Sequence, residues 1–447
     1  MRSRWPGVAY LMILAAMLLM TACGGTSGSS SSNGNTSTSS NPGVLDPNKK
    51  YTVDFWEAFG IGANKTVIED LTKQYMQAHP NVTVKLQAFD SYDTLQTKLT
   101  AAIAANKPPT MAQIYENWAT QFQQSNALAS LQPFISGKNG LSQQDLADFY
   151  PVLLKDGQIG GTQYMLPFNK SDLVLYYNAD MLQKAGVQPP KTLQEFALDL
   201  TKLTKPDGSQ WGLSYTPDVD GWSVLYKALG GGDFTSADGK SAAFADGQNK
   251  QYATQALGLL APLAKAGAVH VTKSYNWQND FISQKAAFGI STIATYAFLA
   301  KPIGNTFKFN EVPLPAGPAG QFTVLFGTNL AIFANANTDA QTAAWDYMKF
   351  LTNTQSNATF VKGTGYMPIR QSTFNSSDLQ SYYEQVPARK VGPQSMGSAF
   401  VASAALGWSQ CRNIITTNFT SAITGQLTPD AAMSKMAQSC NSALSQA

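Results

Sequence analysis

The chain of 447 residues is poor in the residue types that build most metal and redox centres. It contains two histidines, His79 and His270, and three cysteines, Cys23, Cys411 and Cys440. These are too few for a His/Cys cluster at the spacing of a zinc site. No D-x-D-x-D-G loop of the EF-hand type offers a calcium site. We therefore expect neither a metal site nor a cofactor.

Charged residues are also scarce, at 13% of the chain, and the formal net charge is only +3 at pH 7. The basic residues form no cluster of the kind that binds nucleic acid, and no run of like charges is long enough for an interaction tail. The composition therefore gives no indication of a nucleic-acid partner. The length is sufficient for two domains with cores of their own.

The first 22 residues have the pattern of an export signal. Arg2 and Arg4 precede an uncharged apolar run from Val8 to Met20, which is too short to span a bilayer comfortably. The segment Met20-Thr-Ala-Cys23 resembles the lipobox of bacterial lipoproteins, although Met replaces the usual Leu. This resemblance implies that Cys23 receives a diacylglycerol and becomes the mature N-terminus. The alternative is an ordinary signal peptide with an incidental cysteine.

A linker is predicted over residues 23–49. Gly24 to Asn41 contains only Gly, Ser, Thr and Asn, so no apolar side chain offsets the entropy lost on ordering. We expect a flexible tether that holds a folded protein at the extracytoplasmic face of the cell membrane.

Strand and helix patterns alternate in the part that follows the linker. Residues 51–56 alternate like a strand, and residues 64–78 carry the apolar stripe of a helix. The order strand, helix, strand, helix, strand predicts a parallel α/β sheet. The further expected elements of this stretch are strand 81–89, helix 93–105 and strand 110–115.

A second α/β stretch follows Pro167, and a capping box at Thr192-x-x-Glu195 opens one of its helices. The other expected elements are strand 173–177, helix 179–185, helix 276–283, strand 286–291, a β-rich segment 325–334 and helix 338–351. Two helices follow Leu406, the second from about Pro429. Cys411 and Cys440 lie in them, and an exported protein permits a disulfide there. We favour that disulfide over two separate buried thiols.

Four segments carry a family resemblance. They are Leu166-Pro-Phe-Asn-Lys-Ser-Asp-Leu-Val-Leu-Tyr-Tyr-Asn-Ala-Asp180, Gln113-Ile-Tyr-Glu116, Gly363-Thr-Gly-Tyr-Met-Pro-Ile369 and residues 407–412. The first looks like the interlobe crossing of the family-1 extracellular solute-binding proteins of ABC importers, to whose superfamily the maltose-binding proteins belong. The four together resemble the branch that binds glycerol 3-phosphate. The resemblance spans roughly residues 50–445.

The resemblance implies a two-lobed α/β fold of the periplasmic-binding-protein type, maltose-binding-protein-like (type II), with the ligand in a cleft between the lobes. Carried over to this chain, lobe 1 is residues 50–165 plus 296–333. Lobe 2 is residues 166–295 plus 334–447. The lobes are expected to close on the ligand by bending at the hinge.

The resemblance also implies the ligand contacts. The matching positions are Tyr92, Glu116, Ser171, Trp222, Gly327, Tyr366 and Arg412. Their residue types suit the ligand, because a phosphate takes hydroxyl and amide donors and one guanidinium fork. Glycerol hydroxyls need an acceptor such as Glu116, and their carbon edges pack on an aromatic ring such as Trp222.

Two departures from the family pattern are visible. The family serine on the strand near residues 286–295 has no clean counterpart, and Ser291, Thr292 or Thr295 could serve. Trp118 closely follows Glu116 where smaller residues are usual.

These features predict a lipid-anchored receptor that is monomeric and passes glycerol 3-phosphate or a glycerophosphodiester to ABC permease subunits. One guanidinium, Arg412, balances a singly charged diester more fully than a monoester. The alternative ligand is an oligosaccharide, for which four tryptophans could supply platforms. They are Trp56, Trp118, Trp222 and Trp277.

A secreted glycosidase is the competing class, since acids such as Glu57, Asp90 and Glu116 could form a catalytic pair. A pair of carboxylates is weak support by itself, and the sequence has no G-x-S-x-G elbow. We therefore expect a binding protein and not an enzyme.

Overall fold

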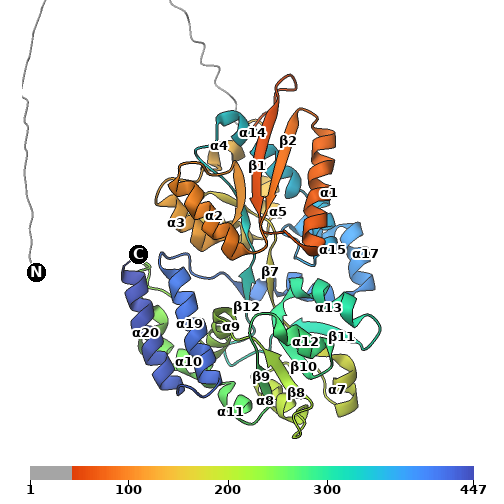
Figure 1. Cartoon of the computed structure of the whole chain (residues 1–447), viewed down its shortest axis with the longest axis vertical. Coiled ribbons are helices and arrows are strands. Elements are labelled where there is room, and N and C mark those ends of the chain that lie inside the picture. The colour runs from red at the N-terminus through yellow and green to blue at the C-terminus, as the bar shows by residue number, and fades with distance from the viewer. Residues whose placement is uncertain (1–42, 447) are drawn as a thin grey trace, which may run out of the picture. The chain divides into compact units, whose positions relative to one another are not determined.

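The computed structural model describes residues 43–446 (Figure 1). The predicted signal peptide, the predicted lipid-bearing Cys23 and the linker up to residue 42 lie outside the described residues. Within residues 43–446, no helix combines the length and the apolar character needed to cross a membrane.

The first lobe is built on a sheet with the strand order β2-β1-β3-β13-β6. The first three strands are parallel, as the strand–helix alternation predicted, and β13 runs antiparallel between β3 and β6. Side chains of β1 alternate between buried and exposed because only one of its faces meets the core. The strands are β1 (Tyr51–Glu57), β2 (Val82–Ala88), β3 (Met111–Ile114), β6 (Met165–Pro167) and β13 (Asn329–Ile332).

Helices from distant segments of the chain pack against this sheet. Figure 1 shows α1 and α14 beside β1 and β2, in agreement with their contacts. The long helices of the lobe are α1 (Gly62–Ala78), α2 (Tyr92–Ala104), α3 (Glu116–Gln123), α14 (Thr338–Leu351), α15 (Thr354–Thr364) and α17 (Ser377–Gln385). The short elements are α4 (Gln132–Ile135), α5 (Gln143–Asp148), α6 (Pro151–Asp156), β4 (Gln158–Ile159), β5 (Thr162–Gln163) and α16 (Gln371–Asn375).

The second lobe is built on a sheet with the order β14-β12-β7-β10-β8-β9, in which β11 also pairs with β7. Seven of the eight residues of β7 are buried, because β7 is a central strand covered on both faces. The strands are β7 (Ser171–Asn178), β8 (Trp211–Tyr215), β9 (Val269–Val271), β10 (Ala286–Thr292), β11 (Phe309–Pro313), β12 (Thr323–Phe326) and β14 (Ala399–Phe400).

Local signals explain where the helices of this lobe begin and end. Helix α8 starts with the predicted capping box of Thr192 and Glu195, and α7 ends at Gly186, which has a left-handed φ of 61°. The α-helices are α7 (Ala179–Ala185), α8 (Leu193–Lys202), α9 (Val219–Leu229), α10 (Gly247–Gly258), α11 (Ala261–Lys265), α12 (Asn276–Ile282), α13 (Tyr296–Ile303), α18 (Val391–Gln394), α19 (Trp408–Ile423) and α20 (Pro429–Ser445). The 3-10 turns are η1 (Ala243–Ala245), η2 (Ile293–Thr295), η3 (Pro387–Lys390) and η4 (Ser395–Ser398).

The predicted disulfide is present. Cys411 in α19 and Cys440 in α20 are bonded, with their Cα atoms 4.8 Å apart. Figure 1 shows α19 and α20 side by side, and both pack against α10 in the core of the second lobe. The bond therefore holds the last helix against the helix that carries Arg412.

Three segments of the described chain connect the lobes. The first lies between β6 and β7, and the second lies between β12 and β13. The third follows α17, which packs against α15 of the first lobe, and leads into η3. In η3, Arg389 forms a buried ion pair with Glu311 of the second lobe.

The predicted lobe boundaries need two corrections. Residues 296–326 were assigned to lobe 1, but α13, β11 and β12 belong to the second lobe. Residues 334–385 were assigned to lobe 2, but α14 packs on β1 and β13, and α15 packs on α1. The apolar faces of α14 and α15 could cover either sheet, so the sequence pattern of these helices does not determine which lobe they join.

Candidate functional site

Six of the seven predicted contact residues lie at ends of elements that face the region between the lobes. Tyr92 begins α2 and Glu116 begins α3, immediately after strands of the first sheet, where clefts of α/β proteins form. Tyr366 follows α15 of the first lobe, whereas Arg412 lies in α19 of the second. The other two, Ser171 and Gly327, flank the first two connections between the lobes.

Two tyrosine hydroxyls meet in this region. The Tyr92 and Tyr366 oxygens are 3.2 Å apart, and the Asn169 side-chain amide donates to Tyr92 at 2.8 Å. The side-chain oxygen Oδ1 of Asn169 accepts hydrogen bonds from Gln113 and Thr328, so the side-chain nitrogen Nδ2 must face Tyr92. This network favours donation from Tyr92 to Tyr366 and leaves the Tyr366 hydroxyl proton for a solute.

The aromatic residues around Tyr366 hold its ring in place. Tyr366 stacks on Phe360 with ring centroids 5.6 Å apart and also contacts Phe59 at 6.2 Å. All three rings belong to the core of the first lobe. Burial raises the pKa of Tyr366, so its hydroxyl stays protonated at neutral pH.

Gly327 holds a close approach between the two connections. Its φ is 90°, and a Cβ at this position would lie 1.8 Å from the Asn169 carbonyl oxygen. The buried Lys170 ammonium donates to the Gly327 carbonyl at 3.0 Å and pairs with Asp156. The charge of Lys170 is therefore neutralised by Asp156 at the connections between the lobes.

Glu116 is the residue that the sequence predicts as the acceptor for glycerol hydroxyls. Burial, together with the neighbouring Asp156, raises the pKa of Glu116 to about 7, although Lys170 and Arg412 act in the opposite direction. At neutral pH the carboxyl group of Glu116 is therefore balanced between its acid and carboxylate forms.

Arg412 does not lie free in the site. Its two terminal nitrogens donate to the two oxygens of Asp220 in α9, at 2.8 and 2.6 Å. Burial lowers the pKa of Arg412, but its attraction and hydrogen bonds to Asp220 outweigh that effect and raise the pKa. The sequence analysis predicted Arg412 as a ligand contact and did not identify Asp220 as its partner.

A second acid lies beside this pair. The side chain of Asp218 caps α9 by accepting from the Gly221 amide at 2.8 Å. Burial and the neighbouring Asp220 raise the pKa of Asp218 to about 7. The start of α9 thus brings two carboxyl groups to one guanidinium.

The lobes contact each other next to this cluster. The Asn117 side chain in α3 donates to the Ser409 hydroxyl in α19. Burial raises the pKa of Tyr115. The neighbours Tyr366, Glu116 and Asp220 raise it further, whereas Arg412 lowers it. Tyr115 therefore lies among candidate residues of both lobes. It stands in a motif that the sequence analysis quoted, but it was not selected.

Trp222 is a correction to the predicted contacts. Its side chain is 0% exposed, stacks on Tyr226 at 5.2 Å and donates to the Ala253 carbonyl. It belongs to the core of the second lobe, because the apolar face of α9 turns inward while Asp220 faces Arg412. Trp222 therefore lines no surface that a solute can reach.

The other tryptophans offer a solute little more. Trp118 packs against Tyr115 at 5.0 Å and is buried, as is Trp277, so of the four suggested sugar platforms only Trp56 remains partly exposed. Ser171 is also buried, at 2% exposure. Of the suggested replacements for the family serine, Ser291 and Thr295 are hydrogen-bonded to each other at 2.8 Å.

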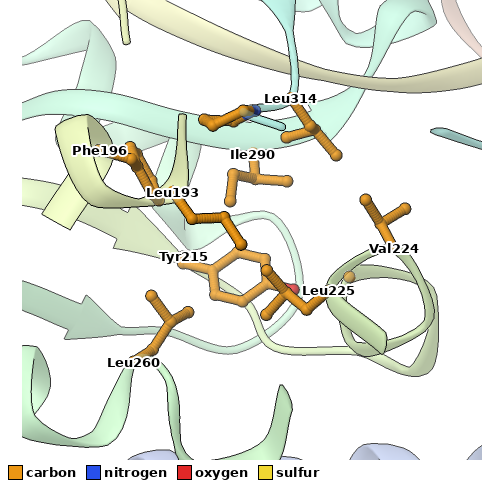
Figure 2. A pocket seen from close by; sticks show the side chains of 10 residues that line it. Leu193, Phe196, Tyr215, Val224, Leu225, Leu260, Ile290 and Leu314 are labelled. Atoms are coloured by element: carbon orange, nitrogen blue, oxygen red, sulfur yellow. The ribbon is translucent and has the colours of Figure 1, made fainter. Parts of the chain in front are cut away.

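Two hollows elsewhere do not coincide with these residues. An apolar cavity in the second lobe has a volume of about 30 Å³. Figure 2 shows its lining, which includes Leu193, Tyr215 and Leu260. The cavity holds one or two waters at most. A polar hollow of about 400 Å³ on the first lobe carries the ion pair Arg370–Asp148 and a contact of 3.5 Å between His79 and Asp346. Its charges are satisfied within the lobe.

Comparison with known proteins agrees with this arrangement. The family model described as bacterial extracellular solute-binding protein matches residues 70–388. The sn-glycerol-3-phosphate-binding periplasmic protein UgpB of Rhizobium meliloti is 23% identical, with 88% of this chain and 94% of that protein covered. UgpB of Salmonella typhimurium is 27% identical, with 86% and 90% covered.

Solved structures share the fold. UgpB from Mycobacterium tuberculosis, solved in complex with glycerophosphocholine, superposes with a TM-score of 0.76 at 20% identity and covers 88% of this chain and 98% of its own. The GacH receptor of Streptomyces glaucescens, solved unliganded and with acarbose, gives a TM-score of 0.76 at 22% identity, with 88% and 98% covered. The two-lobed fold of the maltose-binding-protein type is therefore confirmed.

Proposed function

Because the chain belongs to the family of bacterial extracellular solute-binding proteins, which serve ABC importers, we propose that its solute is a glycerophosphodiester. Proteins of this family bind their solutes outside the cytoplasm, before the solutes are imported. The ligand is proposed to lie between the lobes, in contact with Tyr92, Glu116, Tyr366 and Arg412.

The observation that carries this proposal is the pairing of donors and an acceptor across the lobes. The Tyr92–Tyr366 hydroxyl pair supplies one neutral donor to a phosphate oxygen, the Tyr366 hydroxyl, and Arg412 has N–H groups left beyond the two that Asp220 takes. Glu116 offers the acceptor for glycerol hydroxyls. The names of the UgpB relatives and the glycerophosphocholine complex of one of them support the same ligand class.

Calorimetry tests the ligand class. Glycerophosphocholine, glycerol 3-phosphate and maltotriose are titrated into the wild type, Arg412→Ala and Arg412→Lys. We expect Arg412→Ala to lose most of the phosphate-dependent affinity, and Arg412→Lys to recover only part of it, because an ammonium lacks the planar fork. Lys250→Ala, at an exposed position of α10, is the matched control. Wild-type affinity in Arg412→Ala would show that Arg412 is not the phosphate anchor.

An oligosaccharide is the second candidate. The Arg412–Asp220 pair favours it, because a neutral ion pair and a nearby acid suit sugar hydroxyls as donors and acceptors. The acarbose complex of GacH supports the same class. The burial of Trp118, Trp222 and Trp277 weighs against it, since they provide no stacking surface. Maltotriose binding without binding of either phosphate would favour this candidate.

We further propose that Cys23 carries a lipid, that the protein is monomeric and that its partners are the permease subunits of an ABC importer. The lipobox-like segment and the preceding apolar run support the anchor. The family supports the permease partner.

A further inference from the structure

Asp220 holds the guanidinium that the proposed phosphate needs. The two contacts of 2.8 and 2.6 Å are bidentate and lie in the strongest geometry for an Arg–carboxylate pair. The Arg412 side chain is 28% exposed and that of Asp220 is 6% exposed. Arg412 thus presents an edge to solvent, while Asp220 stands behind it on the protein side.

The surrounding groups do not restore a positive charge. Asp218 lies beside Asp220 at the start of α9, and Glu116 begins α3, whose Asn117 contacts Ser409 in the helix that carries Arg412. Lys170 and Arg389, which lie in connections between the lobes, are already paired with Asp156 and Glu311. Arg412 and Asp220 cancel, so the named groups together have a charge of zero or below.

This charge balance acts on the phosphate that can bind. A guanidinium has five N–H donors, of which Asp220 takes two, so hydrogen bonds to a phosphate remain available. A phosphomonoester carries a charge of about −1.5 to −2 at pH 7, and each negative charge is repelled by Asp220 across the guanidinium. Arg412 attracts each of these charges as well, but the Arg412–Asp220 pair is neutral as a whole, so the second charge of a monoester gains little net attraction and must still be desolvated. A diester bears only one negative charge and avoids that cost.

We infer that Asp220 is a specificity-determining residue, which screens Arg412 and makes the site prefer solutes with at most one negative charge over dianionic phosphomonoesters. The inference rests on the proposed function, because it concerns the same site and the same ligand class. Asp220 acts through Arg412 and needs no contact with the solute.

The test compares two probes that differ by one methyl group and one ionisation, glycerol 3-phosphate and its methyl diester. Their affinities are measured by calorimetry at pH 7.5 for the wild type and for Asp220→Asn, which keeps the shape of the side chain and removes its charge. We expect the wild type to prefer the diester by about tenfold or more. Asp220→Asn should lose most of that preference by gaining affinity for the monoester.

Two further variants make the result specific. Asp207→Asn removes an exposed carboxylate of the same lobe and should keep the wild-type ratio. Asp220→Ser, a smaller neutral residue, repeats the test if Asp220→Asn does not fold, as judged by its melting temperature. If the role of Asp220 were purely structural, its substitution would weaken the binding of both probes equally and leave the ratio of their affinities unchanged.

The outcomes separate this inference from the proposed function. An unchanged ratio in the folded neutral variants overturns the role of Asp220, even if the diester binds well. Failure of both probes to bind the wild type contradicts the proposed ligand class. In that case, new monoester binding in Asp220→Asn still supports the screening by Asp220, and its absence overturns it.

Discussion

Single carboxyl groups between the lobes hold their protons to unusually high pH. In Glu116 the pKa is raised to about 7 by burial and Asp156. The folded protein therefore binds this proton more tightly than the unfolded chain does. Between about pH 4.5 and 7 the folded state retains the proton and the unfolded state has lost it, so stability falls as the pH rises through this window.

Substitution of Glu116 by Gln removes that dependence. We expect the variant to match the wild type near pH 4.5 and to be more stable by about 3 kcal/mol at pH 8. Urea unfolding at several pH values measures the difference. Glu384→Gln, at an exposed position of α17, should show no comparable gain. A constant difference between wild type and Glu116→Gln at all pH values would contradict the assignment.

Gly327 is a second residue with a defined physical role. Its φ of 90° and the 1.8 Å approach of a Cβ to the Asn169 carbonyl oxygen predict that Gly327→Ala is destabilised by more than about 2 kcal/mol. Gly186 also has a positive φ, of 61°, but an added Cβ would meet nothing within 4 Å. Gly186→Ala should therefore cost only about 1 kcal/mol. Equal melting temperatures of the two variants would argue against the close packing at the hinge.

At the scale of elements, the disulfide ties the last helix of the chain to α19. The bond closes a loop between residues separated by 29 positions in the sequence. We expect the double variant Cys411→Ala/Cys440→Ala to lose about 3 kcal/mol of unfolding free energy, mainly because its unfolded chain is less constrained.

Urea unfolding with and without reductant measures this loss. Reductant should destabilise the wild type and leave the double variant unchanged, which separates the bond from the packing of the two side chains. Cys411 directly precedes Arg412 in α19. Because α10 and the core of the second lobe also hold α19 in place, the solute affinity should fall less than the stability. Equal stability of wild type and double variant would show that the bond adds nothing.

At the scale of the whole molecule, contacts from both lobes predict closure on the solute. Tyr92, Glu116 and Tyr366 belong to the first lobe and Arg412 to the second, with the connections between them as the hinge. Small-angle scattering should therefore give a smaller radius of gyration when a confirmed ligand saturates the protein. Arg412→Ala should contract less at the same ligand concentration. No contraction of the wild type at saturation would contradict the assignment of contacts to two lobes.

The position of the protein in the cell is predicted from its first residues. Cys23→Ala should leave the protein without a lipid, so that it is released or mislocalised. Fractionation of cells that express the full chain measures this change. The double variant Cys411→Ala/Cys440→Ala, which keeps Cys23, should remain with the membrane. Membrane retention of Cys23→Ala would show that the anchor lies elsewhere.

Sequence by itself determined the local elements and the family. The helices Ala179–Ala185 and Thr338–Leu351 have the predicted bounds, and the last helix begins at Pro429 as expected. Caps, glycine stops and apolar periodicity act within a few residues, so they can be read along the chain. The motifs that carry the family resemblance are equally continuous in sequence, and the predicted disulfide needed only two cysteines in neighbouring helices.

Only the tertiary structure decided which surfaces meet. It placed α14 and α15 on the first sheet, turned Trp222 into the core and paired Arg412 with Asp220, which lies 192 positions earlier. An apolar stripe can pack on any apolar face, and a guanidinium can pair with any carboxylate within reach. The partner is therefore set by the packing of distant elements, which no local pattern contains.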